Sequence, residues 1–135
     1  MAPRRRQDLK SWFQTLIRTR VWGMDIHPTA RISPSAMIDR TWPRGIHIGE
    51  DVLIADEAVV LTHDFTRGLY LDTHIGARSY LGPRAIVLPG VTIGTDCMIM
   101  PGAFVNKDMP DSSVAIGNPA AVSPRTDRAG HGSDL

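Results

Sequence analysis

The stretch from His74 to Pro110 reads HIGARSYLGPRAIVLPGVTIGTDCMIMPGAFVNKDMP, and a single spacing runs through all of it. A branched aliphatic residue recurs every six positions: Ile75, Leu81, Val87, Ile93, Ile99 and Val105. The residue four places after each one is mostly small or slim: Ser79, Ala85, Val91, Cys97, Ala103 and Met109. Glycines and Pro-Gly pairs lie between them and put a bend into each unit. A period this regular indicates a repeat architecture, in which short strands stack into a solenoid.

The same six-residue spacing begins earlier in the chain, in two blocks: Ile26, Ile32 and Ile38, then Ile48, Ile54 and Val60. The phase slips after Ile38, after Val60 and again after Val105, and we expect Ile116 and Val122 to close the pattern. If three units make one turn, the turns begin at Ile26, Ile48, Ile75 and Ile93, and the insertions share one corner. Insertions on one edge of a solenoid commonly form its binding surface, so we expect the functional site there.

Bulk composition narrows the class of protein. The 135 residues are enough for one domain, and a net charge of +1 argues against a dedicated nucleic-acid binder. The single cysteine, Cys97, excludes an internal disulfide framework and is expected to be a buried structural thiol. No stretch is apolar for long enough to span a bilayer, and no signal peptide is recognisable. These features predict a cytoplasmic protein.

Residues 4–22 have the pattern of an amphipathic helix, with one apolar stripe and a mainly basic opposite face. The stripe consists of Leu9, Trp12, Phe13, Leu16 and Ile17. We interpret residues 1–23 as a capping helix that buries this stripe on the open end of the solenoid. The alternative is peripheral contact with an anionic membrane, which would place the protein at the inner face of that membrane. Residues 124–135 are predicted to form a flexible tail.

Three motifs are similar to those of the hexapeptide-repeat acyltransferases: LPGVTIG at 88–94, VNKDMP at 105–110 and AIGNPA at 115–120. The resemblance implies a mainly β domain over residues 24–123, folded as a left-handed parallel β-helix that forms a homotrimer. The handedness comes from the family alone, because connections between parallel strands are generally right-handed. Outward aliphatics that we expect to be buried between subunits are Val59, Leu61, Ile86 and Leu88.

The segment LTHDF at 61–65, directly before the longest insertion, resembles the sugar and polysaccharide O-acetyltransferases of colanic acid, maltose or galactosides, and nodulation factors. This resemblance implies transfer of an acetyl group from acetyl-CoA to a hydroxyl of a sugar or polysaccharide precursor. His63 matches the general base of that family, and imidazole has a suitable pKa for the task. Asp64, Asp72 or a backbone carbonyl would orient the ring, and we include Asp64 in the catalytic set.

The resemblance also implies that acetyl-CoA lies in a groove between subunits, close to glycines and small residues. Residues at matching positions are Tyr80, Gly82, Ala85, Gly102, Ala103, Lys107 and Arg125. Lys107 and Arg125 would contact phosphates of CoA. The acceptor would be held by the loop after His63 and by the residue that ends it: Phe65, Arg67, Tyr70 and His74.

Two other functions are compatible with the repeat: a non-catalytic β-helix assembly module, and an N-acetyltransferase acting on an amino sugar. A metal hydratase is a third idea, because His47 and His74 should stack on neighbouring turns. The intervals of 20, 16 and 11 residues among His27, His47, His63 and His74 do not match the three-histidine arrangement of the zinc-dependent relatives. We therefore predict neither a metal site nor a metal requirement.

Overall fold

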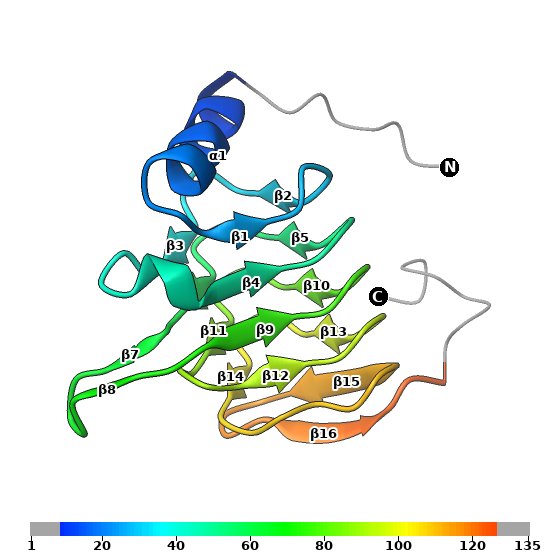
Figure 1. Ribbon diagram of the computed structural model, residues 1–135. Coiled ribbons are helices and arrows are strands. Elements are labelled where there is room, and N and C mark those ends of the chain that lie inside the picture. The colour runs from blue at the N-terminus through cyan, green and yellow to red at the C-terminus, as the bar shows by residue number, and fades with distance from the viewer. Residues whose placement is uncertain (1–8, 127–135) are drawn as a thin grey trace.

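In the computed structural model, residues 9–126 form a parallel β-helix, a prism of stacked turns with the helix α1 (Leu9–Arg20) across one end (Figure 1). Three columns of short parallel strands make the faces of this prism. Column A contains β1 (Asp25–Ile26), β4 (Ile46–Ile48), β9 (Thr73–Ile75) and β12 (Thr92–Ile93). Column B contains β2 (Arg31–Ile32), β5 (Leu53–Ile54), β10 (Tyr80–Leu81), β13 (Met98–Ile99) and β15 (Ser113–Ile116), and β16 (Ala121–Pro124) pairs antiparallel with β15 at its end. Column C contains β3 (Met37–Ile38), β6 (Val59–Val60), β11 (Ile86–Val87) and β14 (Phe104–Val105).

The insertions interrupt this stack at the predicted corner. The 3₁₀ helix η1 (Pro43–Gly45) lies between β3 and β4, and the antiparallel hairpin β7 (His63–Asp64) and β8 (Leu69–Tyr70) lies between β6 and β9. In Figure 1 this hairpin projects away from the stacked turns. The described part of the chain has no helix long and apolar enough to cross a bilayer.

The strand register confirms the predicted turns. Ile26, Ile48, Ile75 and Ile93 are aligned along column A. Ile32, Ile54, Leu81 and Ile99 are aligned along column B, and Ile38, Val60, Val87 and Val105 along column C. All these side chains are buried, and they supply most of the branched aliphatic residues of the core. Each turn therefore covers the aliphatic residues of the next one, and the stack is stable only collectively.

Two predictions near the C-terminus are wrong. Ala115, and not Ile116, occupies the register position beside Ile99, while the Ile116 side chain is exposed. Met109, which lies six residues before Ala115, pairs with Ile93. The six-residue period therefore resumes at Met109. The strand β16 then continues to Pro124 by pairing with β15, so ordered structure passes the expected boundary at residue 123. The rest of the expected tail, residues 127–135, lies outside the described residues.

Glycine at position 76 is required by the stacking of the turns. A Cβ atom there would lie 2.5 Å from the backbone carbonyl carbon of Gly94, one turn further on. Real Cβ atoms do not approach backbone atoms this closely, so any side chain would push the two turns apart. Cys97 is buried as predicted, and this burial raises the pKa of its thiol.

Leu81 offers a test of the collective core. Its side chain is 1% exposed and lies in register between Ile54 and Ile99. Leu81→Ala is expected to lower the free energy of unfolding by about 2–5 kcal/mol, because it leaves a cavity between rigid turns. Thermal unfolding would measure the loss, with Val21→Ala on the exposed surface as control. Equal stability of the two variants would contradict this account of the core.

The helix α1 covers the first turn of the prism, but with the opposite face to the one predicted. Its buried residues are Ser11 and Arg18, whereas Leu9, Trp12, Phe13 and Leu16, four of the five residues of the predicted stripe, are exposed and only Ile17 is half-buried. The expectation that the apolar stripe is buried on the solenoid is therefore wrong. Residues 4–8 of the predicted helix lie outside the described part of the chain.

Backbone polarity explains this orientation. Strand N–H groups of the first turn donate to carbonyls of the second turn, for example from Arg31 to Val52. Successive residues of a parallel strand point to opposite sides, so other carbonyls of the first turn face the open end, where no further strand can donate to them. The helix supplies those donors: the Ser11 hydroxyl to Ile32 O, the Gln14 amide to Pro34 O, and the Arg18 guanidinium to Ala36 O. Polar side chains cap this end because its need is for hydrogen-bond donors.

Candidate functional site

His63 lies at the base of the projecting hairpin, where β7 leaves the coil. Its ring stacks on Tyr70 of β8 at a centroid distance of 4.8 Å, and Phe65 approaches it edge-on at 6.0 Å. Phe65 is 88% exposed and Tyr70 is exposed as well, so the histidine sits in an open aromatic group. Trp42 from the other insertion extends the group, with its ring 5.6 Å from Tyr70. Flat aromatic rings beside a histidine are suited to stacking on a sugar ring.

A buried carboxylate that our sequence analysis did not assign holds the backbone at this histidine. Asp39 Oδ2 accepts hydrogen bonds from the backbone N–H groups of Thr62 and His63, both at 3.0 Å, and Oδ1 accepts one from Thr41. Burial alone would raise the pKa of Asp39, but these N–H donors outweigh it and the pKa lies below its ordinary value. In the sequence, Asp39 stands out only by its position directly after Ile38, where the six-residue phase first slips. His63 lies at the second slip, after Val60.

The hydroxyl of Thr62 donates to Trp42 O at 2.8 Å, and Thr73 Oγ1 donates to Leu61 O at 2.6 Å. Both threonine side chains are fully buried. The segment before His63 is thus tied to both insertions, so the histidine is attached to rigid backbone although its ring is accessible.

Asp64 has a different role from the one predicted. Its carboxylate accepts hydrogen bonds from the Thr66 hydroxyl and backbone and from the Arg67 backbone, and it pairs with the Arg67 guanidinium at 2.5 Å. These bonds from Thr66 and Arg67 bring the pKa of Asp64 far below its ordinary value. The carboxylate closes the turn of the hairpin, and we withdraw Asp64 as the residue that orients His63. Arg67, predicted to bind substrate, is engaged in the same turn.

Three of the small residues predicted along the donor groove are needed by the coil itself. Ala85 and Ala103 point into the core and are fully buried. A Cβ atom on Gly82 would lie 2.7 Å from the backbone nitrogen of Pro101, so this glycine serves the approach of the next turn. Their inward positions leave only backbone groups to contact a ligand, and that contact with CoA stays a prediction.

The other predicted donor residues lie on the surface. Gly102 has a positive φ of 72° and open space around its Cβ position, and Lys107 is exposed beyond the end of β14. Tyr80 is half-exposed on column B. The Arg125 guanidinium donates to Asp96 O at 3.1 Å, so it holds the end of the chain against the coil. Gly102, Lys107 and Tyr80 are the predicted contacts with CoA whose positions are open to solvent.

His47 and His74 stack as expected from the turn count, with a centroid distance of 4.3 Å and nearly parallel rings. His47 Nδ1 is 3.0 Å from Asp25, and its Nε2 is 3.9 Å from Asp72. A groove of about 720 Å³ runs along column A and is lined by both histidines, but not by His63. His74 therefore lies outside the aromatic group around His63.

Among residues 9–126, one group of side chains has metal-ligand chemistry: His47, Asp72 and His74, whose ligand atoms lie within 4.8 Å of one another. Imidazole and carboxylate suit zinc or a similar divalent ion. The sequence spacing did not predict this group. That the chain requires no metal stays a prediction, because acetyl transfer by a histidine base needs none.

Residues 72–107 match the family described as bacterial transferase hexapeptide (six repeats). The chain carries the hexapeptide repeat of the bacterial transferases. It is 35% identical over 107 residues to serine acetyltransferase 4 of Arabidopsis thaliana, a match that covers 76% of this chain and 30% of that relative. Similarity to serine acetyltransferase 2 of the same plant covers 32% of the relative, so this hexapeptide-repeat chain spans about a third of the length of both.

Two solved structures share the fold. A galactoside acetyltransferase in complex with coenzyme A has a TM-score of 0.61 and 26% identity, covering 76% of this chain and 66% of that one. The serine acetyltransferase of Neisseria gonorrhoeae has a TM-score of 0.56 and 28% identity, covering 80% and 43%. The hexapeptide-repeat chain thus has the β-helical fold of these acetyltransferases, and the named acceptors of its relatives include both galactosides and serine.

Proposed function

We propose that this protein transfers an acetyl group from acetyl-CoA to a hydroxyl of a sugar or polysaccharide precursor, with His63 as general base. The observation that carries the proposal is the group around His63: an accessible imidazole on backbone held by Asp39, beside the rings of Tyr70 and Phe65. The CoA complex of the similar galactoside acetyltransferase supports the choice of donor.

In the proposed reaction, the His63 imidazole takes the proton from the acceptor hydroxyl as its oxygen attacks the thioester carbonyl. The new C–O bond forms, the C–S bond breaks, and the imidazolium returns its proton to the departing thiolate of CoA. Imidazole suits both steps because its ordinary pKa is near neutrality. The exposed rings of Phe65 and Tyr70 would stack on the acceptor, and Lys107 would pair with a phosphate of CoA.

We further propose that the protein acts as a homotrimer. Outward side chains form an apolar row on column C: Met37, Val59, Ile86 and Phe104. A second row on column B begins with Arg31 and continues with Leu53, Tyr80, Met98 and Val114, of which Met98 is already buried. Leu61 and Leu88, the other predicted interface residues, are half-buried. Column A instead presents the polar row Asp25, His47, His74 and Thr92. Two apolar faces on a three-sided prism favour burial between copies, with the donor groove at their junction.

The 35% identity to a plant serine acetyltransferase favours a second candidate acceptor, the hydroxyl of serine or a similar small compound. The base and the donor would be unchanged. A screen that follows release of the CoA thiol would separate galactosides, amino sugars and serine as acceptors, and acetylation of an amine would establish the N-acetyltransferase alternative. A cytoplasmic location remains a prediction from the sequence.

Thermal unfolding in the presence of acetyl-CoA distinguishes an acetyltransferase, which should bind this ligand, from a non-catalytic assembly module, which should not. We expect the melting temperature to rise with the logarithm of the acetyl-CoA concentration once this exceeds Kd. At a hundred times Kd the stabilisation is about 2.7 kcal/mol. Lys107→Gln should shift the curve to higher ligand concentration, whereas Lys10→Gln on α1 should not. An unchanged melting temperature in acetyl-CoA would favour the assembly module.

A further inference from the structure

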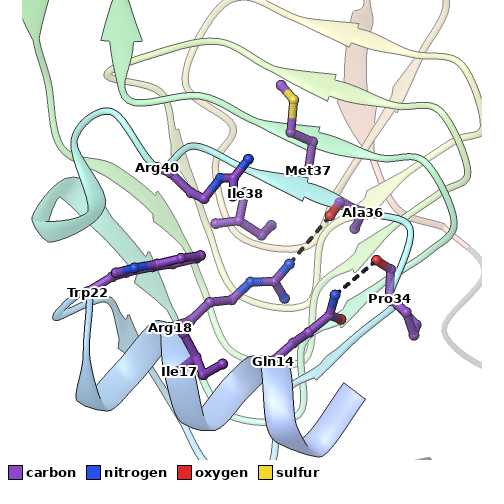
Figure 2. A pocket seen from close by; sticks show the side chains of 9 residues that line it. All are labelled: Gln14, Ile17, Arg18, Trp22, Pro34, Ala36, Met37, Ile38 and Arg40. Atoms are coloured by element: carbon purple, nitrogen blue, oxygen red, sulfur yellow. Dashed lines mark hydrogen bonds between the residues drawn. The ribbon is translucent and has the colours of Figure 1, made fainter. Parts of the chain in front are cut away.

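A pocket of about 320 Å³ lies between α1 and the first turn of the coil, away from His63. Figure 2 shows its lining, with Gln14, Ile17 and Arg18 from the helix facing Ala36, Met37 and Arg40 across the cavity. Two arginines are therefore brought to one small space, by segments about twenty residues apart in the chain.

Arg18 is buried to an unusual degree for an arginine, with 7% of its surface exposed. Its Nη2 reaches Ala36 O at 3.4 Å, whereas Nη1 is buried without a hydrogen-bond partner. Burial, together with the positive charge of Arg40, lowers the pKa of the Arg18 guanidinium. An arginine still cannot lose its proton near neutral pH, so the charge stays in the pocket.

Among residues 9–126, neither Arg18 nor Arg40 forms an ion pair with a carboxylate, so the protein does not neutralise these two positive charges there. The adjacent carboxylate in sequence, Asp39, is occupied by backbone N–H groups. Arg40 instead lies over the ring of Trp22, 5.5 Å from its centroid. Burying an unpaired guanidinium is costly, and the cost falls when an anion binds.

We propose that this pocket binds a phosphate-bearing ligand between Arg18 and Arg40. A guanidinium presents two parallel N–H donors that match phosphate oxygens, and Arg18 Nη1 has such a donor to spare. The side-chain oxygen of Gln14 is also buried without a partner and would accept a hydrogen bond from a ligand hydroxyl. The pocket volume exceeds that of a single phosphate, so the ligand is a phosphate ester carrying a hydroxyl group.

Such an ester has two sources, a soluble phosphorylated compound or the headgroup of an anionic phospholipid. The helix beside the pocket exposes Leu9, Trp12, Phe13 and Leu16 together with Lys10 and Arg20, and it has no acidic residue in its first turn. Aromatic and aliphatic residues next to basic ones are typical of helices that lie on anionic membranes. Membrane contact, the alternative role of this helix in the sequence analysis, would then place a headgroup at the pocket.

The first experiment measures thermal unfolding in inorganic phosphate and in glycerol 3-phosphate, at constant ionic strength set with sodium chloride. We expect a saturable rise of about 5–10 °C for the wild type, larger with glycerol 3-phosphate at equal concentration. Arg18→Gln and Arg40→Gln should each lose this rise. Arg20→Gln, an equal charge change on the same helix outside the pocket lining, should keep it, as should Lys107→Gln at the predicted CoA site. If Arg18→Gln does not fold, Arg40→Gln alone decides.

The second experiment sediments the protein with vesicles of phosphatidylcholine, with and without phosphatidylglycerol. If Arg40→Gln abolishes binding to the anionic vesicles and Arg20→Gln retains it, the ligand is a phospholipid headgroup. If the protein shows the thermal shift but does not sediment with vesicles, the ligand is a soluble ester. Absence of both effects would overturn the proposal, as would an equal loss in Arg20→Gln. A change of oligomeric mass in Arg40→Gln without any phosphate effect would show that these arginines meet carboxylates of a second copy, and would overturn it too.

Discussion

His63→Ala is expected to lower kcat by about 100- to 10,000-fold, because the acceptor hydroxyl then loses its proton acceptor. The histidine ring packs against Tyr70 and Phe65 of the projecting hairpin, so its removal should leave the coil and the binding of acetyl-CoA intact. Steady-state rates, together with thermal shifts in acetyl-CoA, would measure both effects.

The control is His27→Ala, which removes an exposed histidine bonded to Thr29 on the first turn. It should retain full activity. Wild-type rates in His63→Ala would remove the proposed mechanism, and loss of the acetyl-CoA shift in that variant would mean that His63 acts in binding instead.

Asp39→Ala is expected to reduce both stability and turnover. It removes the acceptor of three backbone N–H groups, those of Thr41, Thr62 and His63, at 2.9–3.0 Å. Of these donors only the N–H of Thr62 is fully buried, and a buried donor left without a partner costs about 1–3 kcal/mol, so the free energy of unfolding should fall by about that amount. Because the backbone at His63 is then released, kcat should fall while the KM for acetyl-CoA changes little. This KM-against-kcat split distinguishes positioning from a general loss of fold.

Asp108→Ala is the matched control. Asp108 also accepts a backbone N–H, that of Thr92 at 2.8 Å, but it does so on the exposed surface. Water can replace it there, so the loss of stability should be small. If both variants lose the same stability, burial of Asp39 is not the reason for its effect.

The lowered pKa of Asp39 gives this prediction a pH dependence. A carboxyl whose pKa is lower in the folded state stabilises the protein at pH values above its unfolded pKa, and that contribution disappears as the pH falls towards the native pKa. The difference in melting temperature between wild type and Asp39→Ala should therefore be constant near neutrality and shrink in acid. A difference that grows in acid would contradict the charged state of Asp39.

The coil was predictable because its physics is local and repetitive. One buried aliphatic per six residues defines each unit, and the lengths of the insertions define where a turn ends, so even the alignment of Ile26 with Ile48 followed from counting. The prediction failed after Val105, where the choice between Ala115 and Ile116 depends on a single residue of phase. His63 at the break of the period followed from the family motif, and it stays a prediction.

The sequence by itself determined the period, the three columns and the corner that carries the insertions. Only the tertiary structure decided the partners of the polar groups: Asp39 under His63, Asp64 in its own turn, and Arg18 at the end of the coil. The physical reason is that the first turn has no earlier turn beside it, so those of its carbonyls that point outward, such as those of Ile32 and Ala36, need donors from elsewhere. An apolar stripe cannot supply them, and α1 therefore turns its polar face inward, which leaves Trp12 and Phe13 exposed and two arginines around a pocket.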